Sequence, residues 1–132
     1  MKFLGLLFLS HLLFAELIVQ SNSVIDTTTR LEWQDTAENA QRERKWRDSE
    51  VYCKTLDVDK HYDWRLPTVK ELQSIVSEPQ EKNLFRFIVK DSYWSRDEDG
   101  SIIDAYQVYF GNGHVSTWNK CETLHYRCVR SH

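Results

Sequence analysis

Hydrophobic residues are gathered at the start of the chain and arranged in short patterns after it. Residues 3–14 are almost wholly apolar, follow Lys2 and end at Ala15, just before the acidic Glu16. A positive start, an apolar stretch of about 7–15 residues and a small residue before a polar one are typical of a secretory signal peptide. Because a membrane-spanning helix needs about 20 apolar residues, we expect residues 1–15 to be cleaved on export and to leave no stable membrane span.

The next part of the chain predicts strands followed by a first helix. Apolar and polar residues alternate over 24–34, which favours short strands. The charged stretch 35–45 lacks an apolar stripe and predicts a solvated loop or an exposed helical turn. Residues 46–56 have helical spacing, which places Cys53 on the buried side of a helix.

A second helix is predicted by its capping residues. Thr68 and Glu71 have the spacing of a capping box, in which a hydroxyl and a carboxylate satisfy unpaired backbone amides reciprocally. An apolar stripe follows at 72–76, and Pro79 is expected to end the helix.

The C-terminal half has the pattern of short strands. Segments 93–95 and 105–110 are strand-like, and Gly111-Asn112-Gly113 predicts a hairpin that returns as 114–118. A last strand is predicted over 124–130. Strands before, helices between and strands after predict an α+β domain with mostly antiparallel strands.

Length and composition limit the chain to one domain. Without residues 1–15 the chain loses one lysine, and its formal net charge moves from −3 to −4. The remainder suffices for one hydrophobic core, so we expect a polar leader at 16–23 and a single domain at 24–132. An acidic chain without a basic stripe gives no electrostatic reason to bind nucleic acid. The five Trp residues are many for a domain of this size.

Export makes disulfide bonds possible for the three cysteines, Cys53, Cys121 and Cys128. An odd number leaves one thiol free or one bridge to another molecule. The residues alone leave the pairing open.

Six motifs, in this order, resemble those of the Lcl C-terminal domain family of bacterial exported domains. They are TRLEWQD at 29–35, W-x5-YC-x2-L at 46–56, DWRLPTVKEL at 63–72, YWS at 93–95, AYQVYFGNG at 105–113 and YRCVR at 126–130. The motif residues that we expect to support the fold are Trp33, Trp64, Arg65, Leu66, Pro67, Thr68, Glu71 and Trp94.

The resemblance implies a fold related to C-type lectins and to sulfatase-modifying-factor domains, with two helices packed on mostly antiparallel short strands. It also implies a disulfide between Cys53 in the first helix and Cys128 in the last strand, which leaves Cys121 as the free thiol. The alternative is a pairing of Cys121 with Cys128.

Three groups of residues are candidate sites. The segment 64–68 is either a recognition loop or a folding element, and we favour the folding element with Arg65 paired internally. Carboxylates that could bind calcium are Asp97, Asp99 and Asp104, but they lack the full twelve-residue calcium loop. A zinc or copper set could come from His114, His125 and Cys121, which contain no closely spaced ligand pair. We therefore expect no cofactor.

The function that the sequence and the resemblance favour is that of an exported, non-catalytic binding module, periplasmic or secreted, for a polysaccharide or a surface protein. Exposed aromatic rings suit such partners. Candidate ligand contacts are Trp118, Tyr109, Arg127 and Arg130, and further candidate rings are Tyr62 and Trp46. The alternatives are a copper-dependent thiol oxidase of the sulfatase-modifying-factor type, which would use Cys121, and a structural envelope protein.

Overall fold

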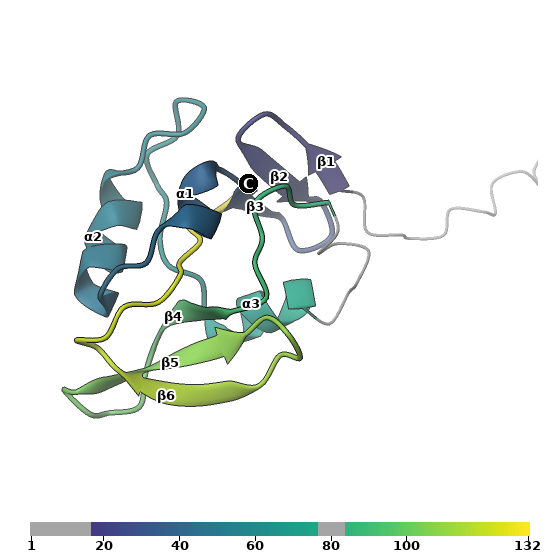
Figure 1. Ribbon diagram of the computed structural model, residues 1–132. Coiled ribbons are helices and arrows are strands. Elements are labelled where there is room, and N and C mark those ends of the chain that lie inside the picture. Colours follow the sequence, from purple (N-terminus) through teal and green to yellow (C-terminus); the bar gives the residue numbers. More distant parts are fainter. Residues whose placement is uncertain (1–16, 77–83) are drawn as a thin grey trace, which may run out of the picture.

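The structure, a computed structural model, describes residues 17–76 and 84–132 (Figure 1). These residues form three helices and two antiparallel sheets, which confirms the α+β class. In chain order the elements are β1 (Leu17–Val19), β2 (Ser23–Asp26), β3 (Leu31–Gln34), α1 (Ala37–Gln41), α2 (Trp46–Thr55), α3 (Val69–Val76), β4 (Ser92–Glu98), β5 (Asp104–Tyr109), β6 (Val115–Asn119) and β7 (Val129–Ser131). The expected signal peptide and Pro79 lie outside the described residues.

The two sheets differ in the sequence separation between their strands. One sheet has the order β1-β2-β3-β7 and joins the two ends of the domain, with Trp33 opposite Val129. The other has the order β4-β5-β6 and is a meander of consecutive strands. Part of the expected polar leader forms β1, which pairs with β2. The expected last strand is shorter than predicted, because regular pairing begins only at Val129.

The structure has a third, short helix, α1, in addition to the two predicted helices. It lies within the charged stretch 35–45, where a helical turn is one of the two predicted alternatives. Its first turn is held by the Thr36 backbone N–H, which donates to Asn39 Oδ1 (2.9 Å). Asn39 is buried and donates from Nδ2 to the backbone carbonyl of Tyr126 (3.0 Å). A tertiary contact of this kind has no signature in hydrophobic periodicity, so the pattern could not decide between a loop and a helical turn.

Helix α3 begins at the predicted capping box. The Thr68 N–H donates to Glu71 Oε1 (2.8 Å), and the Glu71 N–H donates to Thr68 Oγ1 (3.1 Å). This reciprocal pair satisfies two amides that the helix itself leaves unpaired. The predicted apolar stripe is buried, since Leu72, Ile75 and Val76 are at most 8% exposed.

The predicted hairpin joins β5 to β6. Gly113 has φ of 80°, a left-handed conformation that glycine adopts without steric cost. Its N–H donates to the Tyr109 carbonyl (2.7 Å), and the Tyr109 N–H donates to the His114 carbonyl (2.9 Å).

Two buried clusters lie on opposite faces of the β4-β5-β6 sheet. Tyr93 and Val108, which face each other in register, belong to the cluster that includes α3. Trp94 and Ala105 belong to the second cluster, together with Trp46 of α2. Successive residues of a strand point to opposite faces, so this sheet is covered by α3 on one side and by the α2 layer on the other.

A disulfide joins Cys53 in α2 to Cys128, with an S–S distance of 2.08 Å and both residues fully buried. The pairing implied by the family resemblance is confirmed, and the alternative pairing of Cys121 with Cys128 is wrong. Cys121 is an exposed free thiol. Within the described residues, no helix is long and apolar enough to cross a membrane.

Candidate functional site

The first and last motifs meet inside the molecule through Gln34, which is fully buried. Gln34 Oε1 accepts hydrogen bonds from Asn39 Nδ2 (2.9 Å) and from the Cys128 N–H (3.2 Å). Its Nε2 donates to Thr36 Oγ1 (2.9 Å) and to the Tyr52 hydroxyl (3.0 Å). All polar atoms of the Gln34 amide are therefore used by the fold, and none is available to a ligand.

Arg127 is an internal residue, and the prediction that it contacts a ligand is wrong. Its side chain is 0% exposed, with Nη1 lying 3.3 Å from Asp35 Oδ1, and Asp35 is equally buried. Arg127 also donates to the backbone carbonyl of Phe87. The Asp35 carboxylate accepts from the N–H groups of Arg86 (2.9 Å) and Phe87 (3.0 Å). The buried pair therefore ties the segment at Arg86 and Phe87, which precedes β4, to the residues that flank β3 and β7.

Arg130 likewise forms ion pairs within the protein. Its Nη1 lies 2.6 Å from Glu32 Oε1 and its Nε lies 2.6 Å from Asp63 Oδ1. The hydrogen bond from Arg130 lowers the pKa of Asp63. The structure therefore gives Arg130 a role in tying β7 to β3 and to the 63–68 segment, in place of the predicted ligand contact.

The segment 64–68 behaves as a folding element. Arg65 donates through both terminal nitrogens to Glu71, at 2.8 and 2.9 Å. The indole N–H of Trp64 donates to the His61 carbonyl (3.0 Å). The motif residues expected to support the fold are all buried or half-buried: Trp33, Trp64, Arg65, Leu66, Pro67, Thr68, Glu71 and Trp94.

The three carboxylates considered for calcium do not converge. Asp97 Oδ2 accepts from the Val69 N–H (2.8 Å) and so caps α3, while Asp99 Oδ1 accepts from the Ser101 N–H (2.9 Å). Among the described residues, no group of three or more His, Cys, Asp and Glu side chains is placed to hold a metal ion, Asp104 included.

The candidate zinc or copper ligands, His114, His125 and Cys121, do not form such a group among the described residues either. His125 is 8% exposed and its Nε2 lies 3.5 Å from Asp91 Oδ2. His114 and Cys121 are both exposed.

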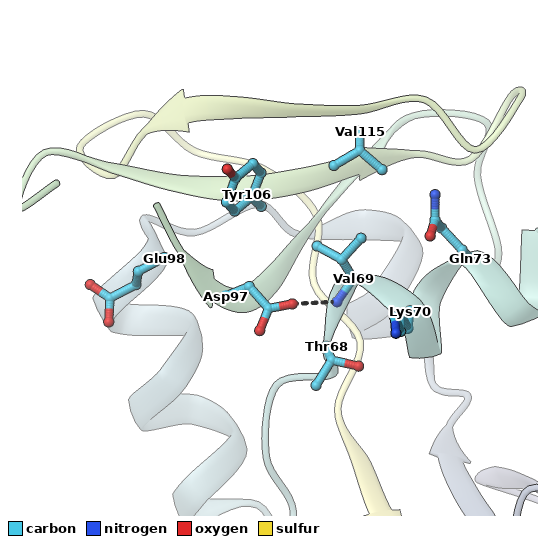
Figure 2. A pocket seen from close by; sticks show the side chains of 8 residues that line it. All are labelled: Thr68, Val69, Lys70, Gln73, Asp97, Glu98, Tyr106 and Val115. Carbon is cyan, nitrogen blue, oxygen red and sulfur yellow. Dashed lines mark hydrogen bonds between the residues drawn. The ribbon is translucent and has the colours of Figure 1, made fainter. Parts of the chain in front are cut away.

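A groove of about 650 Å³ opens between the first turn of α3 and the β4-β5-β6 sheet (Figure 2). Its apolar lining is formed by Val69 of α3, Tyr106 of β5 and Val115 of β6, and the Val115 side chain points toward Val69 (Figure 2). Polar residues complete the lining: Thr68, Lys70, Gln73, Asp97 and Glu98. The groove thus combines a half-buried aromatic ring with hydrogen-bonding groups.

The polar groups of the groove differ in how far the protein already uses them. Asp97 is bonded to the first turn of α3, and Glu98 Oε2 accepts from Lys120 Nζ (2.6 Å). Within the described part of the chain, the Lys70 ammonium and the Tyr106 hydroxyl have no hydrogen-bond partner. These two groups can bond the hydroxyl groups of a sugar, and the Tyr106 ring can pack against its apolar face.

Exposed apolar side chains gather at one end of the same sheet. Ile102 is 91% exposed, Ile103 is 61% exposed and Trp118 is 47% exposed. Tyr62, on a separate loop, is 68% exposed. The suggestion that Trp46 offers an exposed ring is wrong, because it is 2% exposed and its indole N–H donates to the Ser95 carbonyl (2.8 Å).

Tyr109, another candidate contact, is half-buried in the hairpin. A Cβ added at Gly111 would lie 2.1 Å from its ring, so this ring packs directly over the glycine. Tyr109 therefore supports the turn and is not placed in the groove.

A second hollow of about 530 Å³ lies between α2 and the β4–β5 loop, and its lining includes Trp46, Ile102 and Lys120. Lys120 Nζ lies 4.5 Å from the centre of the Trp46 ring and is also bonded to Glu98. Its principal cation is thus already paired, and this hollow is a weaker candidate than the groove.

The sequence interpretation missed the groove residues Lys70, Gln73, Tyr106 and Val115. The alternation along 105–110 does place Tyr106 on the same face as Val108. The alternation does not reveal that α3 lies over that face, because this placement depends on long-range packing.

The family model for the Lcl C-terminal domain matches residues 22–130. A search of curated proteins finds no match.

Proposed function

Because the chain belongs to the Lcl C-terminal domain family, we propose that it is an exported, non-catalytic module that binds a polysaccharide in the groove between α3 and the β4-β5-β6 sheet. The observation that carries this proposal is a groove lined by the half-buried Tyr106 ring and by Lys70, whose ammonium has no hydrogen-bond partner among the described residues. A ring presents apolar area at small entropic cost, and polar groups around it fix the orientation of a ligand.

The proposal includes a fold of the C-type-lectin-like kind. Two features support it: the first and last strands of the domain share one sheet, and a disulfide ties α2 to the C-terminal segment. An experimental structure superimposed on C-type lectins and on sulfatase-modifying-factor domains would test it.

Export to the periplasm or beyond is the third part of the proposal. The buried Cys53–Cys128 disulfide supports it, because such bonds persist in oxidising compartments. N-terminal sequencing of the protein recovered from periplasmic and culture fractions tests this. Export predicts a new N-terminus near residue 16, and an intact Met1 in the cytoplasmic fraction alone would contradict it.

The oxidase alternative receives no support from a specific contact. A thiol oxidase of the sulfatase-modifying-factor type would need two reactive cysteines, but Cys128 is fully buried in the disulfide. Cys121 is the one free thiol of the described residues.

A glycan array with matched variants tests the binding function. We expect the wild-type protein to bind at least one polysaccharide and Tyr106→Ala to bind it about tenfold or more weakly, a loss of about 1.4 kcal/mol. Tyr62→Ala removes an equally aromatic but distant exposed ring and should change the affinity less than about twofold. Circular dichroism and thermal melting verify that each variant is folded.

Two results would overturn the proposal. If no glycan or envelope fraction binds, a structural envelope role becomes the better explanation. If Trp118→Ala abolishes binding while Tyr106→Ala does not, the ligand occupies the exposed end of the sheet and not the groove.

A further inference from the structure

Strand β6 is an open edge of the β4-β5-β6 sheet (Figure 1). The Lys120 N–H donates to the Ile103 carbonyl (2.8 Å) just beyond the strand, and this bond fixes the alternation of the β5–β6 ladder. Every second residue therefore directs its backbone away from β5. These residues are Val115, Thr117 and Asn119. Among bonds within residues 17–76 and 84–132, only the Asn119 carbonyl is used, by the N–H of Glu122 (2.9 Å).

The neighbouring edges are covered by the chain itself. At the outer side of β4, the Trp94 N–H donates to the His125 carbonyl (3.0 Å). At the outer side of β7, the Arg65 N–H donates to the Val129 carbonyl (2.9 Å). The remaining open edge, β1, is three residues long and directly follows residues outside the described part. Among the strands that the structure describes, β6 is thus the longer of the two edges with unused backbone groups.

The composition of β6 favours pairing with a copy of itself. Its sequence, VSTWN, contains no charge and no proline, and its register with β5 has no bulge. Edges that must stay unpaired usually carry such features. Two antiparallel copies of an uncharged strand bring no like charges together, and a twofold arrangement closes without further growth.

We propose that two copies of this chain pair antiparallel along β6, around a twofold axis at Thr117. Thr117 would exchange two backbone hydrogen bonds with its counterpart, and Asn119 would donate to the carbonyl of Val115 in the other copy. About four new backbone hydrogen bonds follow from this register. The two three-stranded sheets become one continuous six-stranded sheet.

The dimer has a consequence for the groove, and this part rests on the proposed polysaccharide-binding function. The twofold axis of an antiparallel strand pair stands perpendicular to the sheet, so both copies present the same face to the same side. Tyr106 and Val115 line the groove on that face, and Val115 belongs to β6 itself. The two grooves therefore open on one side, next to the shared strands, where one polymer chain can occupy both and gain avidity.

Charge variants at the twofold axis test the dimer. In a Cys121→Ser background, which prevents an intermolecular disulfide, sedimentation is measured over about 1 µM to 1 mM. We expect a concentration-dependent monomer–dimer equilibrium for this parent protein. Thr117→Lys alone and Thr117→Glu alone should sediment as monomers, since each places like charges opposite one another. An equimolar mixture of the two should restore the dimer.

The outcomes separate the dimer from the binding function. A parent protein that stays monomeric throughout, or dimers that persist unchanged in both single variants, would overturn the β6 pairing. Variants that melt like the parent protein demonstrate that misfolding is not the cause. If the mixture dimerises but no glycan binds, the pairing stands and the proposed function fails. If both hold, the mixture should bind a polymer more tightly than either variant alone.

Discussion

The Asp35–Arg127 pair places two charges where neither meets water, because both side chains are 0% exposed. Removing one charge leaves the other unpaired in the protein interior. The resulting loss of stability is larger than the stability that the intact pair contributes. We therefore expect Asp35→Asn to lower the free energy of unfolding by about 3–5 kcal/mol in urea titrations.

Arg86 provides the matched control for this prediction. It lies 3.8 Å from the same carboxylate but is 52% exposed. Arg86→Gln should cost at most about 1 kcal/mol, as is usual for exposed ion pairs. Equal losses for Asp35→Asn and Arg86→Gln would contradict the importance of burial.

Glu71 makes the stability of the α3 start depend on pH. Burial raises its pKa, but hydrogen bonds from Arg65 and from the Thr68 N–H outweigh burial and hold the pKa below its ordinary 4.5. A carboxyl with a lower pKa in the folded state stabilises the protein above its unfolded pKa, and this contribution disappears as the pH falls through the folded value.

Glu71→Gln should accordingly destabilise the protein by about 1–2 kcal/mol at neutral pH. The difference in unfolding free energy between this variant and the wild type should narrow as the pH falls below 4.5, the ordinary pKa of this carboxyl. Urea unfolding across the pH range measures this gap. Glu50→Gln is the comparison, since Glu50 pairs with an arginine that is 74% exposed; a gap of the same size and pH dependence there would refute the argument.

Arg127 illustrates what a sequence can and cannot disclose about a single residue. Its position beside Cys128 in a strand-like motif was visible, but its partner Asp35 lies 92 residues away. Local pattern contains no signal for that contact, so the sequence alone could not distinguish an internal arginine from one that contacts a ligand. The internal pairing of Arg65 could be predicted, because its partner Glu71 lies only six residues away in the same motif.

At the level of elements, the disulfide fastens α2 to the C-terminal segment across a sequence separation of 75 residues. Closing so long a loop removes freedom chiefly from the unfolded chain, by about 4 kcal/mol on the chain-entropy model. We expect the double variant Cys53→Ser, Cys128→Ser to lose roughly that much stability in urea. Cys121→Ser, at an exposed free thiol, should stay within about 0.5 kcal/mol of the wild type. A large loss for Cys121→Ser alone would reveal an unrecognised structural role.

Elements with local signals were predicted well, and elements that depend on distant partners were not. The capping box of α3 and the Gly111–Gly113 hairpin rest on hydrogen bonds between residues a few positions apart. Helix α1 instead depends on Asn39, which contacts Tyr126. Strand β1 depends on pairing with β2. Neither contact leaves a periodicity in the sequence.

For the whole molecule, the candidate site arises from the placement of one layer over another. Val69 lies on α3, whereas Tyr106 and Val115 lie on the sheet (Figure 2). Each residue is unremarkable within its own element, since it follows the apolar alternation or begins a helix. Only the packing of α3 across the sheet makes them neighbours, so the groove could not be predicted from the motifs.

The charge of the whole molecule and of the groove predicts which polysaccharides bind weakly. The chain carries a formal net charge of −3, or −4 without residues 1–15, and the described lining of the groove contains two carboxylates, Asp97 and Glu98, and one cation, Lys70. A sulfated polymer would bring further negative charge to this lining. We therefore expect the neutral polysaccharide identified on the array to bind about tenfold more tightly than its chemically sulfated form at low ionic strength.

The salt dependence distinguishes electrostatic exclusion from a poor steric fit. The screening length falls from about 30 Å at 0.01 M to about 8 Å at 0.15 M salt, so added sodium chloride should narrow the gap between the two polymers. Glu98→Gln should narrow it further, because this change removes a carboxylate that is 49% exposed. Isothermal titration calorimetry at the two salt concentrations measures both effects. Tighter binding of the sulfated form would show that the ligand is an anion, and a gap unaffected by salt would assign the discrimination to shape.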